Sequence, residues 1–218
     1  MDGYIDLHVH TKCSDGRYTY EEVIRKSKEN GVKYLAFADH YNMSAYEILY
    51  NKKFNDIEII PGLEIGTSLE PMGYMGKSHR CHMAIYYPSP KIYLLLDRYE
   101  KDRKKCVKFI LENLRKKGID LTYSKLLELA SNPDNIGRFD VAVALFKLGY
   151  AESPTQAYGM YLDCISSAYV NRNKPTPLQI IKFVKKTGGV SVIVHPKSLG
   201  MSRDTIFLKS LQELAWTE

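Results

Sequence analysis

Histidine and glutamate residues recur near the ends of the predicted strands of this 218-residue chain. His8 and His10 lie two residues apart in the stretch YIDLHVH, so their side chains should leave a strand on the same face. His40 follows the apolar run YLAFAD, Glu64 follows IIPGL, and His195 follows VSVIV. In parallel α/β barrels the carboxyl ends of the strands carry the active site. Imidazole and carboxylate groups are ligands for Zn, Mn and Fe, so this set predicts a metal centre.

Further residues near this set allow alternative interpretations. His82 opens the strand-like stretch CHMAIYY, whereas His79 lies in the Gly-rich stretch GYMGKSH. The two compete for one ligand position, and we favour His82 because it belongs to the strand. Asp15 in SDG is a turn residue or a ligand, and these roles are compatible. Asp39 alternates away from His40, which indicates a structural or ligand-orienting role.

Predicted strands alternate with predicted helices over most of the chain. Apolar and alternating stretches predict strands at residues 4–10, 33–40, 57–67, 81–87 and 190–196. Amphipathic spacing and capping residues predict helices at residues 19–31, 41–54, 91–118, 122–130, 137–149, 153–162, 176–189 and 202–218. Thr19 is the expected N-cap of the first helix and Gly31 its stop. This order predicts an α/β fold with a mainly parallel sheet, interrupted by a helical insertion.

The composition, with 44% hydrophobic and 26% charged residues, is typical of a soluble globular protein. No stretch approaches the roughly 18 apolar residues of a membrane span, and the start does not resemble a signal peptide. The cysteines Cys13, Cys81, Cys106 and Cys164 form no C-x-x-C pair, which favours reduced thiols in a cytoplasmic protein. We expect Cys13 and Cys81 to be small buried residues. The net charge of +6 weakly favours anionic ligands, and nothing in the sequence indicates an oligomeric state.

Taken in order, the motifs resemble those of the PHP (polymerase and histidinol phosphatase) family. The matching features are H-x-H, the aspartate of SDG, the DH that ends a strand, GLE, a strand histidine and HP after an apolar run. By this resemblance, residues 1–89 correspond to the first part of a barrel, residues 90–170 to a helical insertion, and residues 171–218 to the return to the barrel. The chain looks most like short bacterial phosphoesterases that act on nucleoside 3′,5′-bisphosphates and on the 5′ ends of short RNAs.

The resemblance implies a distorted (β/α)7 TIM-like barrel with a metal cluster at its carboxyl face. The cluster would contain two or three divalent ions, which would be Mn, Zn or Fe. His8, His10 and Glu64 would hold one ion. Glu64 would also bridge to a second ion, held by His82 and His195.

The resemblance also assigns roles outside these two sites. Asp15 and His40 would hold a third ion, and Arg138 in the insertion would contact the substrate phosphate. The implied reaction is hydrolysis of a phosphomonoester by metal-activated hydroxide, with no catalytic residue separate from the metal cluster. The expected partner is a small phosphorylated substrate, a nucleotide or a short oligonucleotide.

Three departures from the family pattern are visible. Arg138-Phe139-Asp140 stands where the family has Arg-Pro-His, and Tyr41 takes the third place of the DHD motif. The family's late D-x-H motif, which would complete the first and third metal sites, has no counterpart after His195. We therefore expect a barrel with an incomplete C-terminus, which would leave an open sheet edge.

Other functions compete with this interpretation. A PHP-like domain that binds metal or phosphate but turns over poorly would fit the lost motif. A phosphatase of histidinol phosphate or another small metabolite would fit the same ligands. A metal-dependent amidohydrolase would carry a bridging lysine and a late catalytic aspartate, and neither is in place. A nucleic-acid-binding module would not need this set of histidines and acids.

Overall fold

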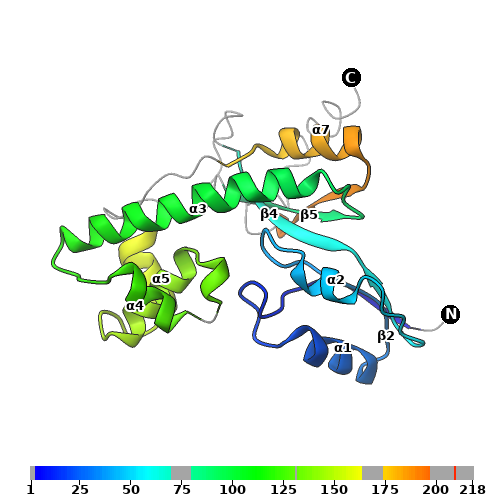
Figure 1. Ribbon diagram of the computed structural model, residues 1–218, viewed down its shortest axis with the longest axis horizontal. Coiled ribbons are helices and arrows are strands. Elements are labelled where there is room, and N and C mark those ends of the chain that lie inside the picture. Colours follow the sequence, from blue (N-terminus) through cyan, green and yellow to red (C-terminus); the bar gives the residue numbers. More distant parts are fainter. Residues whose placement is uncertain (1–2, 70–79, 131, 164–173, 197–208, 210–218) are drawn as a thin grey trace. The chain divides into compact units, whose positions relative to one another are not determined.

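The computed structural model describes residues 3–69, 80–130, 132–163, 174–196 and Lys209 (Figure 1). The chain divides into two compact units. The first unit combines Met1–Leu96 with Lys174–Glu218, and the second is Asp97–Asn173. Among the described residues, no helix is both long enough and apolar enough to cross a membrane.

The first unit begins with a parallel three-stranded sheet. Its strands are β1 (Tyr4–Val9), β2 (Val32–Phe37) and β3 (Glu58–Ile60), in that order across the sheet. Helix α1 (Tyr20–Glu29) connects β1 to β2, and α2 (Ser44–Leu49) lies between β2 and β3 (Figure 1). This part confirms the predicted alternation of strands and helices and the parallel strand direction.

Local sequence explains why α1 begins and ends where it does. Thr19 accepts a hydrogen bond from the backbone of Glu22, and the Glu22 carboxylate accepts one from the backbone of Thr19, which is the predicted N-cap in the form of a capping box. The chain leaves the helix through Gly31, whose φ of +73° favours glycine. Val23 and Ile24 are buried in a core cluster shared with β2 and α2, so α1 covers one face of this sheet.

A second three-stranded sheet in the same unit is antiparallel, which corrects the expectation of a mainly parallel sheet. Its order is β4 (Gly62–Ser68), β5 (Arg80–Tyr86) and β6 (Val190–Val194). A parallel pair needs a crossover of a dozen or more residues, usually a helix, and the sequence between β4 and β5 is shorter than that. The single strand predicted at residues 57–67 is therefore two strands in two sheets. Pro61, which has no N–H group to donate to a ladder, separates them.

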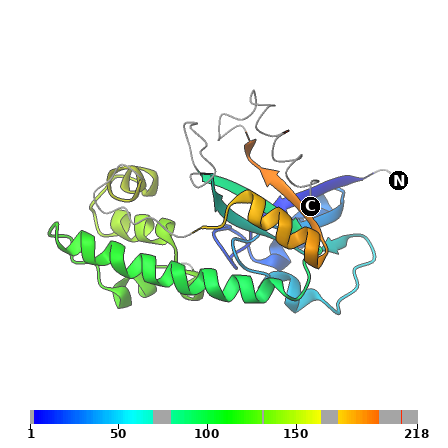
Figure 2. The ribbon, with the colours of Figure 1, turned by 90° about the horizontal axis from the view of Figure 1, so that it is seen from above.

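The antiparallel sheet has one apolar face and one polar face. Alternate residues of β4 and β5 are fully buried and apolar, and the set is Leu63, Ile65, Met83 and Ile85. They pack in one cluster with Ile180 and Val184 of α7 (Pro177–Thr187), which lies along this sheet (Figure 2). Glu64 and His82 occupy the alternate positions and therefore face the other side.

The two sheets meet at one parallel bridge between His40 and Glu64. Backbone bonds from Tyr41 N to Glu64 O (2.9 Å) and from Glu64 N to Asp39 O (3.1 Å) flank this bridge. Within the described residues the six strands form two sheets, and a closed seven-stranded barrel is not seen. The bridge nevertheless brings the end of β2 next to the polar face of β4.

The second unit is helical, as predicted from its amphipathic spacing. It contains most of α3 (Ile92–Arg115), followed by α4 (Tyr123–Leu129), η2 (Pro133–Asn135), α5 (Arg138–Lys147), α6 (Pro154–Ala157) and η3 (Tyr158–Leu162). Apolar residues of α3, α4 and α5 form one core, which includes Ile110, Leu114, Leu126, Val141 and Leu145 (Figure 1).

Candidate metal centre

The carboxylate of Glu64 lies at the centre of a histidine cluster in the first unit. Its side chain is fully buried on the polar face of β4. Oε2 of Glu64 lies 3.1 Å from Nε2 of His8 and 3.1 Å from Nε2 of His10. Oε1 lies 2.6 Å from Nδ1 of His82. The two oxygens of one carboxylate therefore face different histidines.

Two more histidines lie somewhat farther from this carboxylate. Nδ1 of His40 is 3.8 Å from Glu64 Oε2, and Nε2 of His195 is 3.8 Å from Glu64 Oε1. His195 follows β6 with a φ of +53°, a left-handed conformation that is uncommon for residues other than glycine. Such strained positions cluster at functional sites. All five histidines selected from the sequence are thus brought together around Glu64.

Strand geometry explains why these side chains converge. His8 and His10 are two residues apart on and just after β1, and their Nε2 atoms lie 3.3 Å from each other. The β1–β2 register shifts between Asp6 and Val9, so an irregularity of the strand lies at the centre itself.

The antiparallel register explains how His82, near the start of its strand, reaches the centre. Gly66 pairs with His82, and Glu64 pairs with Ala84. His82 is therefore a diagonal neighbour of Glu64 on the same face of the sheet. Because β5 runs opposite to β4, the start of β5 lies beside the end of β4. His79, the alternative candidate, lies outside the described residues.

Asp15 approaches the centre from the loop after β1. Its two oxygens lie 3.3 Å from His10 Nδ1 and 3.6 Å from His40 Nε2. Asp39 holds this loop, because its buried carboxylate accepts hydrogen bonds from the backbone N and the hydroxyl of Thr11 (both 2.7 Å) and from the hydroxyl of Ser14 (2.5 Å). These bonds agree with the structural role inferred for Asp39.

The donor set fits a divalent cation. Oε2 of Glu64 is buried, and within the described part of the chain it has no hydrogen bond of good geometry. A buried carboxylate oxygen left in this state is costly unless a cation satisfies it. Atoms that share an ion at bond lengths of about 2.1 Å lie roughly 3.0–3.4 Å apart. The separations among Glu64 Oε2, His8 Nε2 and His10 Nε2, at 3.1, 3.1 and 3.3 Å, have this size.

In the part of the chain that the structure describes, two overlapping groups of three residues could hold an ion, with the potential ligand atoms of each group within 4.8 Å of one another. One group is His8, Glu64 and His195, and the other is His10, His40 and Glu64. These groups combine the same residues differently from the sites implied by the resemblance, and Glu64 belongs to both. A shared carboxylate is what neighbouring ions need to offset their mutual repulsion.

Burial sets the protonation of these groups. Burial alone would raise the pKa of Glu64, but the close imidazoles of His10, His8 and His82 outweigh burial and hold the pKa well below its ordinary value. Burial lowers the pKa of His40 to about 4, against the opposing effect of Glu64 and Asp15. Burial also lowers the pKa of His195. For His10, burial is outweighed by Glu64 and Asp15, which raise its pKa. A buried anion beside the neutral imidazoles of His40 and His195 favours metal binding.

The shifted pKa of His40 predicts a pH-dependent stability of the metal-free protein. The unfolded chain binds a proton at His40 below about pH 6.5, whereas the folded chain does so only near pH 4. Stability should therefore fall on acidification between these values, by about 2 kcal/mol from pH 6.5 to pH 5. Urea unfolding of chelator-treated protein measures this loss, and His40→Asn should remove it. Equal losses in the wild type and the variant would contradict this assignment.

The remaining residues selected from the sequence belong to the second unit or are the two cysteines next to the candidate ligands. Arg138 begins α5 in the second unit, where its guanidinium lies 3.9 Å from Cys106 Sγ, so its role toward phosphate stays a prediction. Asp140 accepts a hydrogen bond from Gly137 N (2.7 Å) and caps α5. Burial raises the pKa of the Cys13 thiol and raises that of Cys81 to about 11, so both remain protonated thiols.

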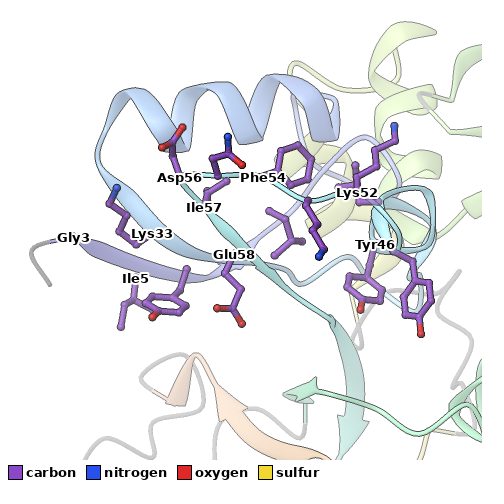
Figure 3. A pocket seen from close by; sticks show the side chains of 15 residues that line it. Gly3, Ile5, Lys33, Tyr46, Lys52, Phe54, Asp56, Ile57 and Glu58 are labelled. Atoms are coloured by element: carbon purple, nitrogen blue, oxygen red, sulfur yellow. The ribbon is translucent and has the colours of Figure 1, made fainter.

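A cavity of about 870 Å³ in the first unit lies away from this centre. Its lining includes Gly3, Ile5, Lys33 and Glu58 from the starts of β1, β2 and β3 and Tyr46 from α2 (Figure 3). His8, His10 and His40 instead lie at or just after the carboxyl ends of β1 and β2. The lining contains none of the candidate ligands, so we place the chemistry at the histidine cluster rather than in this cavity.

Comparison with known proteins points in the same direction. The sequence profile described as PHP domain matches residues 6–173. A 5′-3′ exoribonuclease of Haemophilus influenzae is 29% identical over 198 residues, covering 90% of this chain and 70% of that protein. A 3′,5′-nucleoside bisphosphate phosphatase of Chromobacterium violaceum is 25% identical over 206 residues, covering 93% and 70%. A solved structure from Bifidobacterium adolescentis, described as a metal-dependent phosphoesterase, shares this mixed α/β fold with a TM-score of 0.78 at 22% identity, covering 98% of this chain and 75% of that one.

Proposed function

Because the chain belongs to the PHP domain family, we propose that it is a metal-dependent phosphoesterase that hydrolyses a phosphomonoester of a nucleotide or of an oligonucleotide end. The observation that carries this proposal is the buried Glu64 carboxylate, whose two oxygens face different histidines. The names of the two curated relatives supply the substrate class, since both act on nucleotide or RNA phosphate esters.

We propose that the centre holds two or three divalent ions, which would be Mn, Zn or Fe. Oε2 of Glu64 with His8 and His10 would form one site, and Oε1 with His82 and His195 would form a second. Bound ions of this kind polarise a phosphoryl oxygen and lower the pKa of a water ligand.

Asp15 and His40 would form a third site. The negative charge of Asp15 would come from the loop after β1, which is held by hydrogen bonds to Asp39. Arg138 would add a bidentate contact to the substrate phosphate. The protein's own contribution is thus to hold carboxylates and neutral imidazoles in fixed positions around one buried charge.

We propose a fold in which the two sheets belong to one distorted (β/α)7 TIM-like barrel, with residues 90–170 as a helical insertion. The parallel bridge between His40 and Glu64 supports this proposal, because it joins the sheets at the metal centre. The fold shared with the Bifidobacterium adolescentis structure supports it as well.

The proposed function predicts strict metal dependence. We expect the chelator-treated protein to release no phosphate, and added Mn²⁺ or Zn²⁺ to restore release from adenosine 3′,5′-bisphosphate and from a 5′-phosphorylated oligonucleotide. A colorimetric phosphate assay with histidinol phosphate in parallel separates nucleotide substrates from other small phosphomonoesters. Stoichiometric metal binding without turnover of any of these esters would favour a PHP-like binding domain instead.

A further inference from the structure

Three polar groups converge beside the candidate metal centre, at the point where Gly66 lacks a side chain. A Cβ atom on Gly66 would lie 2.9 Å from the hydroxyl of Tyr41, 3.3 Å from Nζ of Lys174 and 3.5 Å from Nε2 of His82. Gly66 pairs with His82 and is two residues from Glu64, so this point lies on the metal-centre face of the sheet. An ammonium group therefore lies beside His82, on the side away from the Nδ1 atom that contacts Glu64.

Backbone contacts explain how Lys174 reaches this position. The backbone N of Ser68, at the end of β4, donates a hydrogen bond to the carbonyl of Pro175 (2.8 Å). Thr176 then caps α7 through Gln179. The segment before α7 is thus tied to the carboxyl end of β4, two residues beyond Gly66.

Tyr41 is fixed at both ends to the same strand. Its backbone N donates to Glu64 O (2.9 Å), and its hydroxyl donates to Gly66 O (2.8 Å). Its φ of +53° is strained for a tyrosine, and such strain persists where the surroundings over-determine the conformation. Because the hydroxyl proton is committed to Gly66, the hydroxyl oxygen keeps lone pairs that can accept a hydrogen bond, and it lies near the Gly66 position that the ammonium of Lys174 also approaches.

We propose that Lys174 is a second cationic contact for the substrate phosphate at this centre, and that Tyr41 positions its ammonium group. A lysine ammonium is a compact charge with three donors and suits the non-bridging oxygens of a phosphate. The phosphate dianion would separate Lys174 from the bound metal ions and offset the repulsion between them. This inference rests on the proposed phosphoesterase function. It adds a contact from within the first unit to the contact expected from Arg138.

The test uses the full chain loaded with Mn²⁺. Isothermal titration with inorganic phosphate gives the affinity, and hydrolysis of adenosine 3′,5′-bisphosphate gives kcat/KM. We expect Lys174→Met to weaken phosphate binding and kcat/KM about 10- to 100-fold while the bound metal stays unchanged. Lys174→Arg should recover most of the binding because it retains the charge, and Lys91→Met, which removes an exposed lysine, should match the wild type.

Two further variants test the geometry. Gly66→Ala places a methyl group where the hydroxyl and ammonium groups meet, so it should weaken phosphate binding as Lys174→Met does. Tyr41→Phe should weaken it several-fold, since it removes the acceptor and leaves the charge.

The outcomes separate this inference from the function on which it rests. Wild-type turnover with unchanged phosphate binding in Lys174→Met would overturn the inference and leave the function standing. Loss of bound metal together with phosphate in that variant would also overturn it, by showing a structural role. Phosphate binding that depends on Lys174 without any ester hydrolysis would support the inference and refute the function. A wild-type protein that binds no phosphate would overturn both.

Discussion

Replacing Glu64 by glutamine is expected to reduce metal-dependent phosphate release by more than about 100-fold, since loss of residues that merely orient ligands already costs about 10- to 100-fold. Glutamine keeps the volume of the side chain but removes the charge that faces five imidazoles. Its amide NH₂ group would also replace one carboxylate oxygen, and would therefore place a hydrogen-bond donor either beside His8 and His10 or beside His82. Because both oxygens of Glu64 contact the cluster, one substitution weakens more than one site.

Metal analysis and phosphate assays of the same preparations measure this effect. Glu64→Gln should bind fewer ions per chain than the wild type under identical loading. Glu58→Gln is the matched control, because Glu58 is exposed on β3, which belongs to the other sheet, and no ion pair with a histidine is seen for it among the described residues. Full metal content and full activity in Glu64→Gln would show that the cluster is held together without a bridging carboxylate.

The residues that cluster around Glu64 could be selected from the sequence because their positions depend on local periodicity; their role as ligands stays a prediction. The H-x-H spacing of His8 and His10 places both on one face of any strand, whatever its partners. Apolar runs identify the strands, so His40 and His195 could be assigned to positions just after strand ends, whereas Glu64 proves to be the third residue of β4. The helices of the second unit follow from amphipathic spacing in the same way.

Strand direction could not be predicted in this way, because it depends on connections rather than on side-chain pattern. The stretches that form β3 and β4 are separated by Pro61 alone, and they read as one interrupted strand until their partners are known. The antiparallel pairing of β4 with β5 is what places His82 diagonally opposite Glu64. Periodicity alone places His82 near the start of a strand, away from the carboxyl ends where the site was expected, whereas the register places it diagonally beside Glu64.

The contacts around Gly66 also could not be predicted from the sequence. Lys174 precedes a proline in a segment without periodicity, so it looks like an ordinary loop residue. Its position depends on one backbone bond between Ser68 and Pro175, which joins segments far apart in the chain. A glycine inside a strand was the available signal, since such glycines often mark close approach of other groups.

Asp39 provides the second large expected effect, through the loop that carries Asp15. Its carboxylate is almost fully buried and accepts three hydrogen bonds, two from Thr11 and one from Ser14. Hydrogen bonds to a charged acceptor each contribute about 1.5–3 kcal/mol, and removing the acceptor leaves the buried Thr11 donors unsatisfied. We therefore expect Asp39→Ala to lower the free energy of unfolding by roughly 4 kcal/mol.

The same substitution should also reduce activity about 10- to 100-fold, because Asp15 would no longer be held near His10 and His40. Urea unfolding and phosphate release measure the two effects separately. Asp39→Asn should fall between the wild type and Asp39→Ala, since it keeps one acceptor oxygen. Asp56→Ala is the matched control, because the Asp56 side chain is 71% exposed and should change stability by less than about 0.5 kcal/mol. A stable Asp39→Ala protein with wild-type activity would mean that the loop after β1 holds its conformation without this carboxylate, and that Asp15 does not depend on it.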